Sequence, residues 1–126
     1  MRELQWKWLW WSVGICLVAG VIAGSLMPNP DAVMPIRLWD KFQHAGAYAL
    51  LMLWFGWLYR RPWQALPAAA LVGLGVALEF VQAAVGRDFS YGDMLADALG
   101  VTFAWMVVAS PLGAALSWLE SRLIRA

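Results

Sequence analysis

The chain has 126 residues, of which 63% are hydrophobic and only 13% are charged. A soluble domain carries about a quarter charged residues, so this composition supplies too few polar side chains to cover a surface in water. The net charge of +1 lacks the basic excess of a nucleic-acid-binding protein, and we expect no nucleic acid partner. The length allows a single domain over residues 1–126, which we expect to lie in a membrane.

Four apolar stretches each approach the roughly 20 residues that a helix needs to cross a bilayer. They cover residues 8–26, 42–59, 64–85 and 94–116. Helix-breaking residues separate them, including Pro28 in the first connection and Pro62 in the second. Pro111 lies inside the fourth stretch, where we expect it to bend the helix. The sequence thus predicts an all-α fold, an integral membrane four-helix bundle.

Positive charges are unevenly distributed among the segments that flank these predicted spans. Four crossings would place on one side Arg2, Lys7, Arg60, Arg61, Arg122 and Arg125. The other side would receive Arg37, Lys41 and Arg87. Because Lys and Arg are enriched in cytoplasmic segments, we expect both termini in the cytoplasm. The N-terminal pattern also occurs in signal peptides, but its apolar run is long for a signal core.

Ten tryptophans are many for a chain of this length. They crowd the N-terminal segment and bracket the second connection, at Trp6, Trp8, Trp10, Trp11, Trp54, Trp57 and Trp63. Tryptophan prefers the membrane–water interface, where the ring meets acyl chains and the N–H meets headgroups. We therefore expect these side chains to form an interfacial belt rather than an aromatic core.

Small residues recur at helical spacing in three of the predicted spans. The three faces are Gly20 with Gly24, Ala69 with Gly73 and Ala77, and Ala96 with Gly100 and Ala104. Faces of this kind let helix backbones approach closely. We expect them to pack within one chain, with a homodimer as the alternative use.

Polar residues gather at the predicted outer ends of the second, third and fourth spans. Asp40, His44 and Tyr48 repeat every four residues, which places them on one helix face. The topology brings the polar residues of the other two spans to the same membrane face. We therefore expect one outward-facing pocket formed by Asp40, Lys41, His44, Tyr48, Glu79, Gln82, Arg87, Asp93 and Asp97.

Local roles compete with a ligand site at several of these positions. Asp40 has the position of an N-cap for the second helix. Ser90 and Asp93 have the spacing of a capping box for the fourth. Capping does not explain Glu79, which lies about 9 Å inside the third span at 1.5 Å per residue. A charge at that depth needs a partner, so we expect Glu79 to face the bundle interior. A static ion-pair network is the alternative to a ligand site.

The residue types limit the chemistry of this pocket. His44, Glu79 and the two aspartates of the fourth span could exchange protons or bind a divalent ion. Zinc sites usually contain several His or Cys ligands, and the chain has one of each. We expect no metal and no cofactor. The sequence contains no Gly-rich phosphate loop, HExxH or GxSxG motif, so whether the chain is an enzyme stays open.

Two segments of this polar set resemble the signatures of the VanZ-like family. Residues 40–44 followed by Tyr48 resemble the first, and residues 79–82 followed by Arg87, Ser90 and Asp93 resemble the second. The match covers residues 36–104, with one departure, because the family commonly has Asn where this chain has Asp97. The family is named for a protein linked to teicoplanin resistance. The resemblance implies a multi-pass protein of the bacterial cytoplasmic (inner) membrane that works near cell-envelope lipids or precursors, and it brings no established reaction.

Three functions remain open at this level. We favour a binding or accessory protein whose partner is a membrane lipid, a lipid-linked envelope precursor or an amphiphilic lipoglycopeptide antibiotic. In that reading Lys41 and Arg87 would bind the anion of a headgroup. The first alternative is an intramembrane enzyme that acts on a lipid-linked substrate at the outer leaflet. The second is a structural subunit of a membrane complex.

Overall fold

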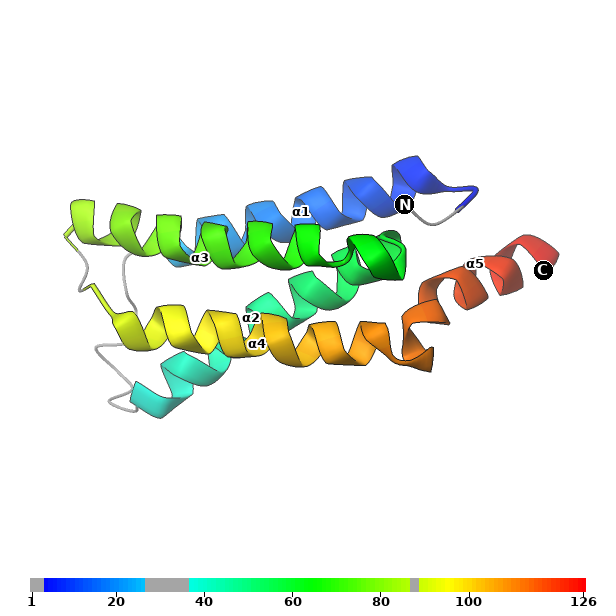
Figure 1. Cartoon of the computed structure of the whole chain (residues 1–126). Coiled ribbons are helices and arrows are strands. Elements are labelled where there is room, and N and C mark those ends of the chain that lie inside the picture. Colours follow the sequence, from blue (N-terminus) through cyan, green and yellow to red (C-terminus); the bar gives the residue numbers. More distant parts are fainter. Residues whose placement is uncertain (1–3, 27–36, 87–88) are drawn as a thin grey trace.

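The computed structural model describes residues 4–26, 37–86 and 89–126, and all regular structure within these ranges is helical. The helices are α1 (Lys7–Leu26), α2 (Arg37–Leu58), α3 (Ala65–Ala84), α4 (Tyr91–Ala109) and α5 (Ala115–Arg125). Short 3₁₀ turns at Arg61–Trp63 and Pro111–Ala114 precede α3 and α5. Helices α1 to α4 alternate in direction, and α5 extends beyond one end of the molecule (Figure 1). The all-α prediction is confirmed.

Within the described ranges, three helical segments are long and apolar enough to cross a membrane. This finding supports a membrane protein and is compatible with several crossings. The segments are Lys7–Leu26, Arg61–Ala84 and Tyr91–Ala109. Helix α2 has 22 residues but does not join this group. Its first turns carry Asp40 and Lys41, and its second half is central, with Leu51 and Met52 fully buried. Because neighbouring helices cover α2, less of its surface would contact lipid. It therefore does not need to be apolar along its whole length.

The fourth predicted span is not one helix. Helix α4 ends at Ala109, and Ser110 is extended, with φ −80° and ψ 177°. The Ser110 hydroxyl then accepts a hydrogen bond from the Leu112 amide and caps the 3₁₀ turn that starts at Pro111. The expectation that Pro111 only bends a continuous helix is wrong. Proline disfavours the helical conformation of the preceding residue, and the Ser110 side chain offers the backbone another partner.

The core forms where α2 packs against α4. A Cβ atom at Gly100 would collide with the backbone carbonyl oxygen of Ala45, and one at Gly56 would lie 2.6 Å from Cγ2 of Val108. The small face of α4 is buried at Ala96, Gly100 and Ala104, as the spacing predicts. Glycine therefore permits the close approach of these two helices.

The other two small faces do not pack within the described chain. A Cβ atom at Gly20, Gly24 or Gly73 would have no heavy atom within 4 Å. Ala69 and Ala77 are likewise exposed. The expectation of packing within one chain is wrong for these faces, because the outer sides of α1 and α3 turn away from α2 and α4.

Part of the tryptophan set forms a cluster inside the protein. Trp10 is buried, and its ring lies 6.0 Å from that of Trp54, which donates to the Trp10 carbonyl at 3.0 Å. Trp10 itself donates to the Glu120 carboxylate of α5 at 2.5 Å. Trp8 and Trp63 are exposed. The belt prediction therefore fails for Trp10, which joins the start of α1 to α2 and α5.

Candidate functional site

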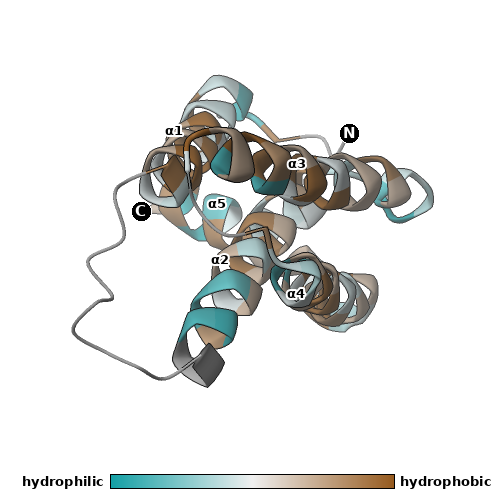
Figure 2. Cartoon of the chain, turned by 90° about the vertical axis from the view of Figure 1, so that its left-hand side faces the viewer, coloured by the Kyte–Doolittle hydropathy of each residue, from teal (hydrophilic) through white to brown (hydrophobic). Residues whose placement is uncertain are grey.

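The polar side chains meet at the end of the bundle away from both chain termini. The start of α2, the end of α3 and the start of α4 all lie at this end (Figure 1). Viewed from there, the first turns of α2 are the most hydrophilic part of that helix (Figure 2). The predicted grouping of these segments at one end is therefore observed. Arg87 lies outside the described residues.

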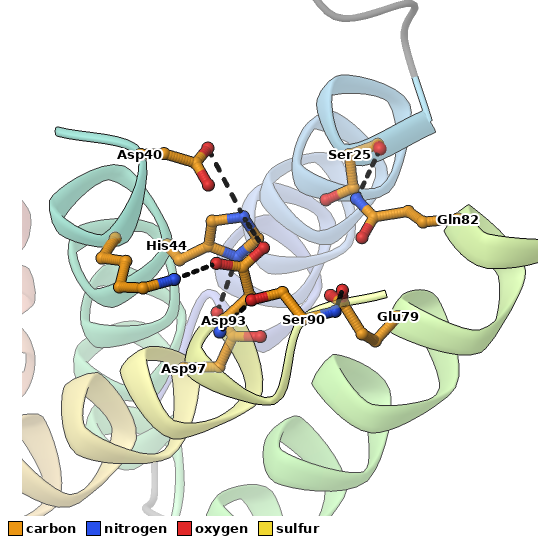
Figure 3. Close-up of polar contacts among 9 residues, drawn as sticks. Ser25, Asp40, His44, Glu79, Gln82, Ser90, Asp93 and Asp97 are labelled. Atoms are coloured by element: carbon orange, nitrogen blue, oxygen red, sulfur yellow. Dashed lines mark hydrogen bonds and ion pairs between the residues drawn. The ribbon is translucent and has the colours of Figure 1, made fainter. Parts of the chain in front are cut away.

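His44 is the centre of a cluster between α2 and α4 (Figure 3). Its Nδ1 lies 3.0 Å from Oδ1 of Asp97. Its Nε2 lies 3.6 Å from Oδ2 of Asp93 and 3.9 Å from Oδ1 of Asp40. Where Asp97 is ionised it can only accept, and Nδ1 of His44 is then the donor. Nε2 faces the other two aspartates.

Lys41 completes this α2–α4 cluster, which consists of Asp40, Lys41, His44, Asp93 and Asp97. The lysine Nζ forms an ion pair with Oδ1 of Asp93 at 2.8 Å. A Cβ atom at Gly92 would lie 2.7 Å from this Nζ, so glycine there leaves room for the lysine over the start of α4. Lys41 is thus engaged by a protein carboxylate rather than held free for an anion.

Asp40 is not the N-cap of α2. The helix begins three residues earlier at Arg37, so Asp40 lies in its first turn. A carboxylate there interacts favourably with the positive end of the helix dipole. Its side chain is 37% exposed and faces His44. The capping interpretation is wrong because the helix extends past the boundary of its apolar stretch.

Ser90 caps α4 as predicted, but the reciprocal half of the capping box comes from elsewhere. The Ser90 hydroxyl accepts from the Asp93 amide at 3.2 Å. The Ser90 amide donates to Oε1 of Glu79 on α3 at 2.6 Å, and the Asp93 side chain turns to Lys41 instead. Glu79 therefore completes the start of α4 from another helix, and Asp93 is released for the cluster.

Glu79 and Gln82 act mainly on the backbone of other helices. Glu79 is 1% exposed and faces the interior, which confirms that prediction. In the described part of the chain, its hydrogen-bond partner is the Ser90 amide. Gln82 donates to the Ser25 carbonyl in the last turn of α1 at 2.7 Å. Polar backbone groups at a membrane need such internal partners, so capping explains two residues for which the sequence suggested a ligand role.

Tyr48 and Asp97 form the inner edge of the cluster. Tyr48 is 2% exposed and lies close enough to Asp97 and Glu79 to interact with them electrostatically. Asp97 is 3% exposed and lies against α3, where a Cβ atom at Gly75 would be 2.8 Å from its Oδ2. Gly75 and Gly92 could not be identified from the sequence, because an isolated glycine in an apolar helix does not indicate which side chain packs against it.

The cluster includes a possible ligand set for a metal ion. One atom each from Asp40, His44 and Asp93 lies within 4.8 Å of the others. The same arrangement provides an acid–base pair, because Asp97 orients His44 and leaves Nε2 toward Asp40 and Asp93. Both uses involve residues of the cluster rather than Glu79 or Gln82.

Comparisons with family models, with curated proteins and with solved structures found no match to this chain. The resemblance to the VanZ-like family thus depends on the residues quoted for it.

Proposed function

We propose that this chain is a VanZ-like protein that crosses the bacterial cytoplasmic membrane four times and binds the polar head of an envelope amphiphile. Its partner would be a membrane lipid, a lipid-linked precursor or a lipoglycopeptide antibiotic. Helix α2 would be the fourth crossing, shielded by its neighbours. The positive-charge bias orients the α2–α4 cluster to the outer leaflet.

One observation carries this proposal. Ionisable side chains from two helices meet at one end of the molecule, with His44 held by Asp97 at 3.0 Å. Charged groups are costly at a membrane, and they commonly mark substrate or ion sites. Capping does not account for Asp40, His44 or Asp97, because none of them contacts a helix end in the way that Glu79 does.

The charges of the cluster favour a particular kind of head. Asp40, Asp93 and Asp97 outnumber Lys41 and His44, and the lysine is already paired with Asp93. Such a site repels a bare phosphate and attracts a cation. The partner should therefore present an ammonium group, or a phosphate accompanied by a metal ion. The ion pair of Lys41 with Asp93 disfavours the anion capture expected of that lysine, and Arg87 lies outside the described residues.

A binding experiment tests this function directly. Purified protein would be offered zwitterionic, anionic and polyprenyl-phosphate-linked lipids and teicoplanin, and retention would be read by native mass spectrometry. We expect one class to be retained, and His44→Ala to weaken its retention at least about tenfold, because a hydrogen-bonded charged contact is worth about 1.5–3 kcal/mol. Gln43→Ala is the matched control, since Gln43 is exposed on the same helix. Equal retention by folded His44→Ala would refute the proposal.

An intramembrane enzyme is the second candidate, and the His44–Asp97 pair is the observation that favours it. A carboxylate that fixes an imidazole through Nδ1 leaves Nε2 to take up or deliver a proton. Incubation of purified protein with a lipid-linked phosphate substrate would reveal turnover. Asp97→Asn should then lower the rate while leaving substrate retention intact, whereas a pure binding protein should give no product.

A further inference from the structure

Three side chains of the α2–α4 cluster direct donor atoms toward a common point. Nε2 of His44 lies 3.6 Å from Oδ2 of Asp93 and 3.9 Å from Oδ1 of Asp40. Two ligands at about 2.1 Å from a metal lie roughly 3.0–3.5 Å apart in octahedral or tetrahedral coordination. All three donor atoms lie within 4.8 Å of one another, so shifts of about an ångström would bring them to that spacing. We propose that Asp40, His44 and Asp93 bind a divalent metal ion.

The hydrogen bond between His44 and Asp97 is of a kind found at metal sites. A ligating histidine almost always donates its second ring N–H to a carboxylate or carbonyl, which fixes the ring and its tautomer. Asp97 supplies this carboxylate at 3.0 Å from Nδ1. It is 3% exposed and wedged against Gly75 of α3, so its position is set by a helix that contributes no ligand.

Asp93 provides a second and independent indication. It is only 8% exposed, and the hydrogen bond that it accepts from Lys41 goes to Oδ1. Among the described residues, Oδ2 of Asp93 then faces Nε2 of His44 at 3.6 Å, which is too long for a hydrogen bond. Oδ2 of Asp93 and Nε2 of His44 are thus two donor atoms that lie close together without a direct hydrogen bond.

The donor set indicates which metals fit. Two carboxylate oxygens and one imidazole nitrogen suit Mn²⁺ or Zn²⁺ better than Ca²⁺, which takes six to eight oxygen ligands. Three protein ligands leave coordination positions open. The inference deepens the proposed function and rests on it in one respect: an open position would accept a phosphate oxygen of the headgroup, beside Lys41. Metal binding itself does not depend on that step.

Titration of chelator-treated protein in detergent tests the metal site. Free Mn²⁺ would be measured by electron paramagnetic resonance, and Zn²⁺ would be added as a competitor. We expect one saturable site that Asp40→Asn weakens at least about tenfold and Asp97→Asn about 10–100-fold, as for other residues that orient metal ligands. Glu120→Gln is the matched control, because it makes the same carboxylate-to-amide change at the opposite end of the bundle.

Two results would overturn the metal site. One is folded wild-type protein without saturable binding of either ion, and the other is Asp40→Asn with wild-type affinity. Circular dichroism and size-exclusion chromatography report folding, and Asp40 is exposed enough for its substitution to be tolerated. Lipid retention before and after chelation separates the two proposals. Metal binding without lipid retention refutes the headgroup function alone, whereas lipid retention by protein that shows no saturable metal binding refutes the metal site alone.

Discussion

At the scale of single residues, glycine positions set how closely the helices pack. Gly100 faces the Ala45 carbonyl, so a side chain there must displace the backbone of α2. We predict that Gly100→Ala lowers the free energy of unfolding by about 1–3 kcal/mol, the usual range for overpacking. Gly73→Ala is the matched control, since space around Gly73 is open and alanine favours a helix. Thermal unfolding in detergent would measure both, and a neutral Gly100→Ala would contradict the close contact.

Glu120 makes stability depend on pH at the opposite end of the molecule. Burial raises the pKa of this carboxyl group, but hydrogen bonds from Trp10, Gln5 and Trp6 outweigh it and hold the pKa below the ordinary value. Its contribution to stability should therefore be complete above the unfolded-state pKa of about 4.5 and lost as pH falls through the folded-state value.

Comparison of two proteins isolates this effect from the other acidic groups. Glu120→Gln should have a lower midpoint of thermal unfolding than wild type at pH 7. The difference should shrink as the pH falls below the folded-state pKa, where wild-type Glu120 is also neutral. A difference that stays constant from pH 7 to acid pH would show that the charge of Glu120 contributes nothing.

At the scale of helices, side chains from distant parts of the chain satisfy the free backbone groups at helix ends. Glu120 accepts from the Gln5 and Trp6 amides before α1, and Glu79 accepts from Ser90 before α4. Gln82 donates to the last turn of α1. Each cap lies on another helix, so helix ends and helix packing stabilise one another.

Gln64 performs this role for two helices at once. Its fully buried side-chain nitrogen donates to the Gly56 carbonyl at 3.0 Å and to the Val108 carbonyl at 3.3 Å, near the ends of α2 and α4. Substitution Gln64→Leu should leave both carbonyls without this donor and cost about 1–3 kcal/mol. Unfolding in denaturant would measure the loss. Substitution of exposed Arg60 or Arg61 in the same turn should matter much less, and an equal loss would contradict the specific role of Gln64.

The sequence predicts where most helices lie, but it does not predict these caps between helices. The length of the apolar runs gave the positions of α1 and α3 to within a few residues. The break at Ser110 and Pro111 lies inside an apolar run, so hydropathy alone joins α4 to α5. The separation of four residues predicted that Asp40 and His44 share a helix face, and in the structure both side chains lie near Asp93. That Glu79 and Gln82 cap other helices depends on packing across many residues, which no local pattern contains.

At the scale of the whole molecule, the structure gathers basic residues at the end away from the α2–α4 cluster. The start of α1, the turn before α3 and helix α5 meet there (Figure 1), and they carry Lys7, Arg60, Arg61, Arg122 and Arg125. The proposed orientation predicts that reporter fusions after Arg61 and after Arg125 both indicate the cytoplasm. A periplasmic signal from either fusion would contradict the orientation and place the cluster at the inner leaflet.

The contact between Glu120 and the start of α1 has a consequence for biosynthesis. The Gln5 amide and the Glu120 carboxylate are 115 residues apart, nearly the whole chain. A ribosome that adds about 5–20 residues per second would release the carboxylate roughly 6–23 s after the amide. During that interval α1 must remain at the insertion machinery or in lipid without its final partner. Helix α1 is therefore synthesised well before the carboxylate that fixes its beginning.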